Sequence, residues 1–259
     1  MKKQAFTTLR CLNAYAFIAM VIINMLAILL PINGVTTGQA ADAWPNLFVP
    51  TGLTFSIWGV IYILLLLFVV TNLIWFQKAE YAESTERIGY LFILSCVFNI
   101  GWIFSWHYQQ IALSLILMLA LYFVMALIYR RVIKNPYRFR EKLFLQIPFS
   151  VYFGWLTIAL IANISVLLVS LGWHGSGLSE SLWTILTMAL GVLIGAVVIR
   201  RNHDLVYALV LAWAYLGIFL KHQNADGFNM AYPMVMWAAL AGSVILLAIG
   251  FLSFQQKHT

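Results

Sequence analysis

Charged side chains are scarce in this chain. They make up 9% of its 259 residues, whereas 63% of the residues are hydrophobic. Soluble domains carry roughly one charged residue in four. The composition therefore excludes an ordinary soluble domain and predicts a protein that crosses a membrane several times. The net charge is +7, but the basic residues lie between hydrophobic runs, so they indicate membrane topology and not nucleic-acid binding.

Cysteine is also rare, and the common catalytic motifs are missing. Cys11 and Cys96 lie far apart and beside or within apolar runs, which predicts neither a disulfide framework nor a metal site. The chain lacks an HExxH motif, a glycine-rich phosphate loop and a serine elbow. Deep ionisable residues are missing from the apolar runs, which argues against a coupled pump, although an ion site made of carbonyl groups stays open. We predict no catalytic and no metal-binding residue.

Eight apolar runs are each long enough to cross a bilayer as a helix. They cover roughly residues 11–31, 51–76, 89–108, 110–130, 146–170, 182–199, 204–220 and 230–253. The first run is longer than the apolar core of a signal peptide, so we interpret it as a span. The fold class predicted from the sequence is an all-α, polytopic bundle of about eight transmembrane helices.

The basic residues predict the orientation of these spans. If the N-terminus lies inside, 14 of the 15 Lys and Arg residues fall in inner segments, and only Lys221 falls in an outer one. Cytoplasmic loops of membrane proteins carry an excess of Lys and Arg. The sequence therefore predicts a multi-pass protein of the cell membrane with both termini in the cytoplasm.

The longest outer connection, residues 32–50, is rich in apolar side chains. It contains Trp44, Pro45, Phe48 and Pro50, and Asp42 is its only charged residue. Aromatic residues beside a membrane usually lie at the level of the lipid headgroups. A lid folded over a pocket is the alternative interpretation.

The start of the second span carries a stripe of aromatic residues. Phe55, Trp58 and Tyr62 are three and four residues apart and follow Pro50. Proline is well tolerated in the first turn of a helix, and positions three or four apart share one face. We therefore expect a helix that begins at Pro50 and presents these aromatics on one side.

Two more stripes combine aromatic rings with an amide. They are Asn99, Trp102 and Trp106 in the third span, and Tyr152, Trp155, Ala159 and Asn163 in the fifth. An amide in hydrocarbon must find a partner, so Asn99 and Asn163 should point into the bundle. Core packing explains any one of these residues. Three stripes that face a common interior favour a flat apolar ligand, because rings stack on rings.

Several other residues are interpreted as structural. Asn24 and Asn72 are lone amides within spans. His107 lies at an outer helix end, so we interpret it as an interfacial histidine in preference to a haem ligand. Gly191 and Gly195 form a GxxxG pattern, which lets two helices approach closely. We expect helix packing there, with a homodimer as the alternative.

Three segments resemble the TspO/MBR family, the tryptophan-rich sensory or translocator proteins. Residues 48–62 are similar to the family's Pro-Pro-Gly…Phe…Trp…Tyr second helix, with Thr51 where the family often has a second proline. Asn99-Ile-Gly-Trp102 resembles its Asn-x-x-Trp third helix. The fifth-span residues resemble its Trp-x3-Ala-x3-Asn pattern, with Val151 in place of a proline. The resemblance extends over about residues 11–170.

The resemblance implies a five-helix bundle that binds tetrapyrroles such as protoporphyrin IX, or sterols in some members, in a cavity that opens toward the first loop. It divides the chain into residues 1–175, a TspO-like domain, and residues 176–259, three additional helices. Those helices would cover the face that smaller members use to form dimers.

These observations together predict a protein of the lipid bilayer that binds a hydrophobic small molecule, with a porphyrin as first candidate, for sensing or transport. No cofactor is required, and protoporphyrin IX or haem is a candidate ligand. Three alternatives stay open: an uncoupled permease for a small hydrophobic solute, a protein that degrades porphyrin in light, and an assembly partner whose aromatics are only core. The predicted lining residues are Trp44, Phe55, Trp58, Tyr62, Asn99, Trp102, Trp106, Trp155 and Asn163.

Overall fold

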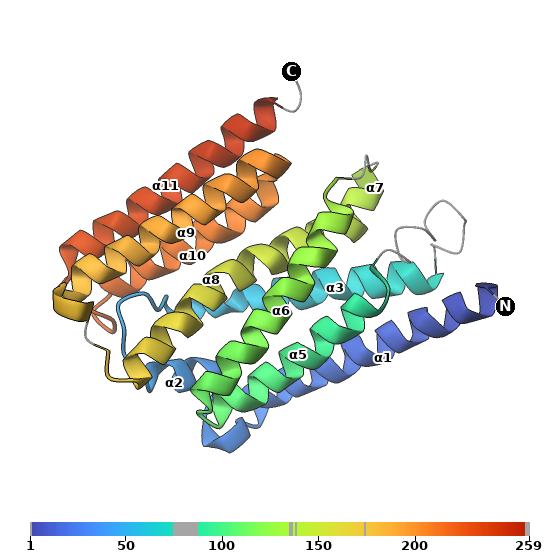
Figure 1. The fold of residues 1–259 in the computed structure, drawn as a ribbon, viewed down its shortest axis with the longest axis horizontal. Coiled ribbons are helices and arrows are strands. Elements are labelled where there is room, and N and C mark those ends of the chain that lie inside the picture. Colours follow the sequence, from blue (N-terminus) through green and yellow to red (C-terminus); the bar gives the residue numbers. More distant parts are fainter. Residues whose placement is uncertain (1, 75–87, 135–136, 138, 174, 257–259) are drawn as a thin grey trace. The chain divides into compact units, whose positions relative to one another are not determined.

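The chain is built from membrane-length helices (Figure 1). A computed structural model describes residues 2–74, 88–134, 137, 139–173 and 175–256. In this part of the chain, eight helices are long and apolar enough to cross a membrane, and no strand occurs. The predicted all-α polytopic fold and its eight spans are confirmed.

The long helices are α1 (Lys2–Leu29), α3 (Ile57–Ile74), α5 (Tyr90–His107), α6 (Ile111–Val132), α8 (Ile147–Ser170), α9 (Glu180–Asn202), α10 (Leu205–Gln223) and α11 (Pro233–Gln256). The short elements are η1 (Ile32–Gly34), α2 (Thr37–Asp42), the 3₁₀ turn η2 (Gly52–Ser56), α7 (Phe139–Glu141), the π-helical η3 (Lys142–Gln146) and η4 (Gly175–Gly177).

The second span begins later than the sequence predicts. Pro50 and Thr51 precede the 3₁₀ turn η2, Thr51 is the extended N-cap of that turn, and the α-helix α3 begins only at Ile57. The expected start at Pro50 is therefore wrong. The reason is tertiary: the backbone N–H of Thr51 donates to the carbonyl of Gly217 at 3.2 Å, which holds this stretch outside the α-helix. Phe55 consequently belongs to the 3₁₀ turn and not to the helical face of Trp58.

Contacts within the chain define two compact units. The first unit comprises Met1–Ala40 and Trp58–Phe153, and the second comprises Ala41–Ile57 and Gly154–Thr259. Helix α8 contributes its first turns to one unit and its remainder to the other. The division into 1–175 and 176–259, which follows from the resemblance, stays a prediction.

Three phenylalanines form part of the core of the first unit. Phe68 of α3, Phe92 of α5 and Phe149 at the start of α8 are fully buried. Their ring centroids lie 5.0 to 6.3 Å apart in tilted and edge-to-face pairs. Such pairs contribute about 0.5–1.5 kcal/mol each beyond the burial of their area. In the same unit α5 lies beside α1 and α6 (Figure 1).

Glycines bring α9, α10 and α11 of the second unit close together (Figure 1). A Cβ atom on Gly195 would lie 2.6 Å from Leu211 of α10 and 2.8 Å from Leu246 of α11. A Cβ atom on Gly191 would lie 2.5 Å from the hydroxyl of Tyr215. The GxxxG pattern therefore serves packing inside the chain, as expected. A homodimer stays a prediction.

Candidate functional site

Four aromatic side chains of the first unit stack in a row. These residues, Tyr62, Trp58, Trp102 and Trp106, are called the aromatic ladder. Tyr62 and Trp58 have centroids 5.7 Å apart, Trp58 and Trp102 6.3 Å apart, and Trp102 and Trp106 5.7 Å apart, with interplanar angles of 22 to 29°. The row joins two of the predicted stripes, because α3 contributes two rings and α5 the other two.

A chain of amides and a hydroxyl runs beside the ladder. The side-chain amide of Asn24 in α1 donates to the Oδ1 of Asn99 in α5 at 2.7 Å. The Nδ2 of Asn99 donates to the hydroxyl of Tyr152 in α8 at 3.0 Å, and the Tyr152 ring meets Trp58 edge-on at 5.8 Å. Asn99 points into the bundle as predicted, and Asn24, predicted as a lone structural amide, is its partner.

Two polar atoms of the ladder are buried without a hydrogen-bond partner among the described residues. They are the hydroxyl of Tyr62 and the Nε1 of Trp102. Trp102 is only 5% exposed. A buried polar group left unpaired costs about 1–3 kcal/mol. The ladder therefore carries two unused hydrogen-bond donors within a stack of rings.

The first half of the predicted lid covers the C-terminal end of α5. The indole Nε1 of Trp106 donates to the carbonyl of Thr37 at 3.1 Å. The amide of Asn33 donates to the carbonyl of His107 at 3.0 Å. Residues 32–40 thus fold back onto the end of the ladder, which favours the lid interpretation for this half of the loop.

His107 is buried instead of interfacial. Its Nδ1 lies 2.8 Å from the carbonyl of Ile103, and its Nε2 lies 3.4 Å from the hydroxyl of Thr37. Both ring nitrogens are engaged, so binding to a haem iron would break one of these contacts. The interpretation of His107 as a structural residue agrees with this geometry.

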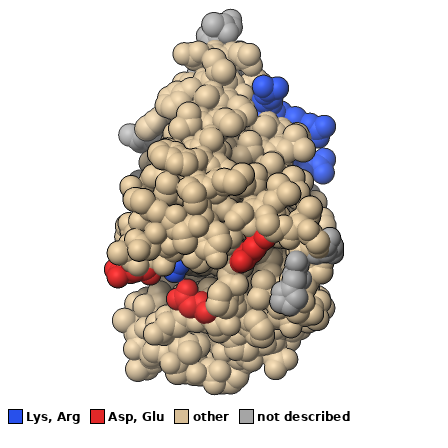
Figure 2. Space-filling view, turned by 90° about the vertical axis from the view of Figure 1, so that its left-hand side faces the viewer, with Lys and Arg blue, Asp and Glu red and all other residues tan. Residues whose placement is uncertain are grey.

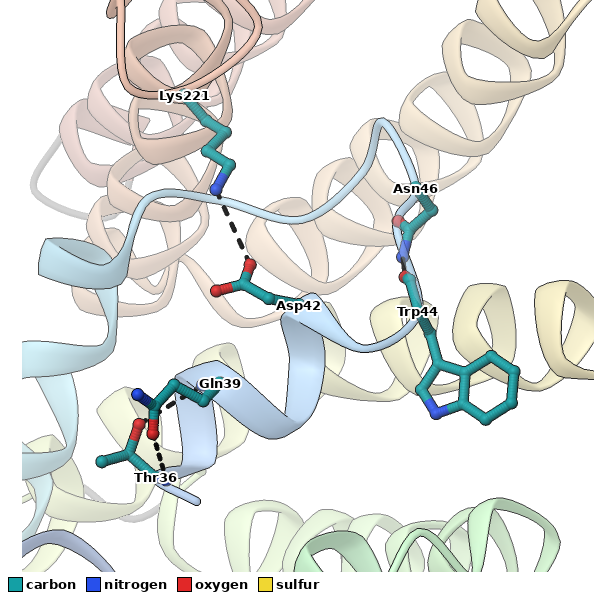
Figure 3. A network of polar contacts seen from close by, with 6 residues as sticks. All are labelled: Thr36, Gln39, Asp42, Trp44, Asn46 and Lys221. Atoms are coloured by element: carbon teal, nitrogen blue, oxygen red, sulfur yellow. Dashed lines mark hydrogen bonds and ion pairs between the residues drawn. The ribbon is translucent and has the colours of Figure 1, made fainter. Parts of the chain in front are cut away.

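The remaining predicted lining residues belong to the second unit. They are Trp44, Phe55, Trp155 and Asn163. The rings of Phe55 and Trp155 meet edge to face at 5.8 Å, and Trp155 and Asn163 are buried. The carbonyl of Trp44 accepts from the amide of Asn46 at 3.0 Å, and Figure 3 shows the Trp44 ring directed away from this contact and from Asp42.

The chain matches the family described as TSPO-like protein over residues 10–252. It belongs to this family. The match continues through α9, α10 and α11, whereas the resemblance in the sequence motifs ends near residue 170. The family match therefore includes the three additional helices. Neither a curated protein nor a solved structure matches the chain.

In this TSPO-like chain, α10 holds the second half of the predicted lid. Residues 42–54 are called the docked segment. Lys221 lies 3.7 Å from Asp42 (Figure 3), and the Nε2 of the buried His222 lies 3.0 Å from the carbonyl of Leu47. An exposed ion pair stabilises little, so the buried histidine contributes more to this contact.

The far end of the docked segment is held more closely. The indole Nε1 of Trp213 donates to the carbonyl of Thr54 at 3.1 Å. Thr54 packs against Gly217, whose carbonyl accepts the N–H of Thr51. This contact was not predicted from the sequence, because no spacing within one helix relates Thr54 to Gly217.

Proposed function

We propose that this protein binds a flat hydrophobic molecule with acidic edge groups against the aromatic ladder, with a metal-free porphyrin such as protoporphyrin IX as first candidate. One observation carries the proposal: Tyr62 and Trp102 place two unpaired buried donors on one stack of rings. The rings would stack on the macrocycle. The donors would bind a propionate carboxylate, since hydrogen bonds to a charged acceptor are the stronger ones.

The residues present fit a porphyrin better than a haem. Trp58 and Trp102 supply ring faces. Asn99 accepts a hydrogen bond from Asn24 and donates one to Tyr152, which holds α1, α5 and the start of α8 together around these rings. His107 has both ring nitrogens engaged. Binding would serve sensing or transport, as proposed from the resemblance.

A titration followed by the porphyrin Soret band tests the proposal. We expect protoporphyrin IX to bind the purified protein saturably in the micromolar range, about −8 kcal/mol. Trp102→Phe keeps a ring but removes the N–H, and Tyr62→Phe removes the hydroxyl. Each should weaken binding about tenfold, the value of a hydrogen bond to a charged group. Trp237→Phe, an exposed position on α11, should bind like the wild type.

Linear uptake that equals that of an unrelated membrane protein would contradict the proposal, because it would show partition into detergent. Two further measurements separate binding from its alternatives. Substrate flux in proteoliposomes would favour the permease. Loss of the Soret band in light that requires a tryptophan would favour porphyrin degradation.

We also propose that both termini lie in the cytoplasm. In the described part of the chain, Arg130 and Arg131 lie in the last turn of α6, and Arg200 and Arg201 lie in the last turn of α9. Lys and Arg concentrate on the cytoplasmic side. A fluorescent protein fused after the C-terminus should fluoresce, and alkaline phosphatase inserted in the connection between α8 and α9 should be active. The reverse pattern would contradict the proposed orientation.

A further inference from the structure

A cavity that contains no residue of the aromatic ladder lies within the second unit. It measures about 300 Å³ and is bounded by residues 45–48, the last turns of α8, the connection after α8 and the first two turns of α9. None of its lining residues belongs to the ladder. Pockets for small ligands measure about 300–1,000 Å³, so this one suits a molecule of modest size.

Three hydroxyl oxygens in the lining are free to accept hydrogen bonds. Ser165, Thr184 and Thr187 each donate the hydroxyl hydrogen to the backbone carbonyl four residues earlier, at 3.0, 2.9 and 3.0 Å. A hydroxyl oxygen has two lone pairs besides its single hydrogen. These side chains therefore offer acceptors to a ligand that brings its own donors.

The charge of the lining is negative. Glu180 is the only charged residue among those that line the cavity in the described part of the chain. Glu180 is the first residue of α9. The hydroxyl of Ser179 caps this helix by accepting from the backbone N–H of Leu182, so the Glu180 carboxylate is not the capping group. Figure 2 shows separate acidic side chains and a few basic ones on a face whose other described residues are uncharged.

Two tryptophans supply aromatic faces beside this carboxylate. The rings of Trp173 and Trp183 meet at 4.3 Å and 71°, so they form a corner with two differently directed faces. Leu168 and Val169 add an apolar wall. A cation is attracted to the face of a tryptophan ring, and a carboxylate with hydroxyl oxygens accepts hydrogen bonds from an ammonium group.

We propose that this cavity binds a small organic ammonium ion with an aromatic or apolar body. The ammonium hydrogens would meet Glu180 and the hydroxyl oxygens, and the body would lie against the tryptophan corner and the apolar wall. A carboxylate ligand would meet Glu180 with like charge. A neutral alcohol would fit the space without the charge attraction. The site is independent of porphyrin binding at the ladder.

Isothermal titration calorimetry of the full chain in nanodiscs at pH 7 tests this proposal with three probes of similar shape. They are 2-phenylethylammonium, 2-phenylethanol and phenylacetate, which differ in charge. We expect the ammonium to bind at least tenfold more tightly than either of the others. Glu180→Gln should weaken ammonium binding at least tenfold. Asp226→Asn, a matched change at an exposed carboxylate between α10 and α11, should leave it within twofold.

Equal affinity for the three probes, or unchanged ammonium affinity in Glu180→Gln, would overturn the proposal and leave only apolar partition. If Glu180 only complemented the helix dipole, Glu180→Gln would change the stability of the protein but not its selectivity among the three probes. If Glu180→Gln does not fold, Thr187→Val decides instead, since it removes one acceptor and keeps the shape; unchanged affinity there would overturn the proposal. The porphyrin titration should be the same in all these variants, so failure at either site is distinguishable.

Discussion

Gly217→Ala is expected to detach the end of the docked segment from α10. A Cβ atom at this position would overlap the hydroxyl of Thr54 and would lie 2.8 and 2.9 Å from its Cγ2 and Cβ atoms. Threonine is branched at Cβ and stiff, so its side chain cannot turn away while the backbone stays. The 3₁₀ turn would have to move as a whole and would lose its hydrogen bonds to Gly217 and Trp213.

The cost combines two effects. Overpacking a tight contact costs about 1–3 kcal/mol, and each of the two hydrogen bonds contributes about 1 kcal/mol. We expect a loss of about 3 kcal/mol in the free energy of unfolding in detergent. Hydrogen exchange of the amide of Thr51, which donates to Gly217, should become markedly faster.

Two further variants show whether the clash is the cause. Thr54→Ala in the Gly217→Ala background removes the overlapping atoms and should restore part of the stability, so the two changes should couple strongly in a double-mutant cycle. Gly59→Ala is the matched control, because no atom lies within 4 Å of a Cβ there and alanine favours a helix. Equal losses at Gly59 and Gly217 would show that the docked contact is unimportant.

Asn99→Leu is expected to separate the hydrogen-bonded helices of the first unit. Leucine is similar in size but leaves the hydroxyl of Tyr152 without its donor and removes the acceptor of Asn24. Asn24 keeps its second bond to the carbonyl of Met20 at 2.9 Å, so Tyr152 bears the larger loss. An interhelical hydrogen bond in a membrane contributes about 0.6 kcal/mol on average, and a stranded buried group adds about 1–3 kcal/mol.

We therefore expect Asn99→Leu to reduce the free energy of unfolding by about 2 kcal/mol. Asn24→Leu added to it should cost little more, because their shared bond is already broken. Asn202→Leu is the matched control, since that amide bonds only the carbonyl of Val198 in its own helix among the contacts described. Losses at Asn24 and Asn99 that simply add would contradict a shared network.

The ladder shows which part of a site local rules can predict. Trp58 and Tyr62 are four residues apart on α3, as are Trp102 and Trp106 on α5, and each pair stacks at 5.7 Å and 22° as the helical period requires. The stack of Trp58 on Trp102 joins two helices. That contact depends on how whole helix faces pack, and no spacing within one helix contains it.

Polar partners show the same limit. The rule that a buried amide must be paired predicted that Asn99 points inward, but the rule does not say that Asn24 is the partner. The identity of the partner follows from the packing of α1 against α5. The unpaired donors of Tyr62 and Trp102 could not be predicted either, because a donor is unpaired only with respect to neighbours from other helices.

The sequence by itself determined the membrane class, the eight spans, the stripes and the TSPO-like character of the first five helices. These properties depend on apolar length, helical period and residue type, which are local. Only the tertiary structure decided where the second span begins, why position 217 is a glycine, and where the hydroxyl acceptors of the cavity in the second unit lie. The first two depend on atoms of residues more than 100 positions apart, as with Thr54 and Gly217, and the third depends on side chains from α8 and α9. The packing of whole helix faces selects which of these residues meet.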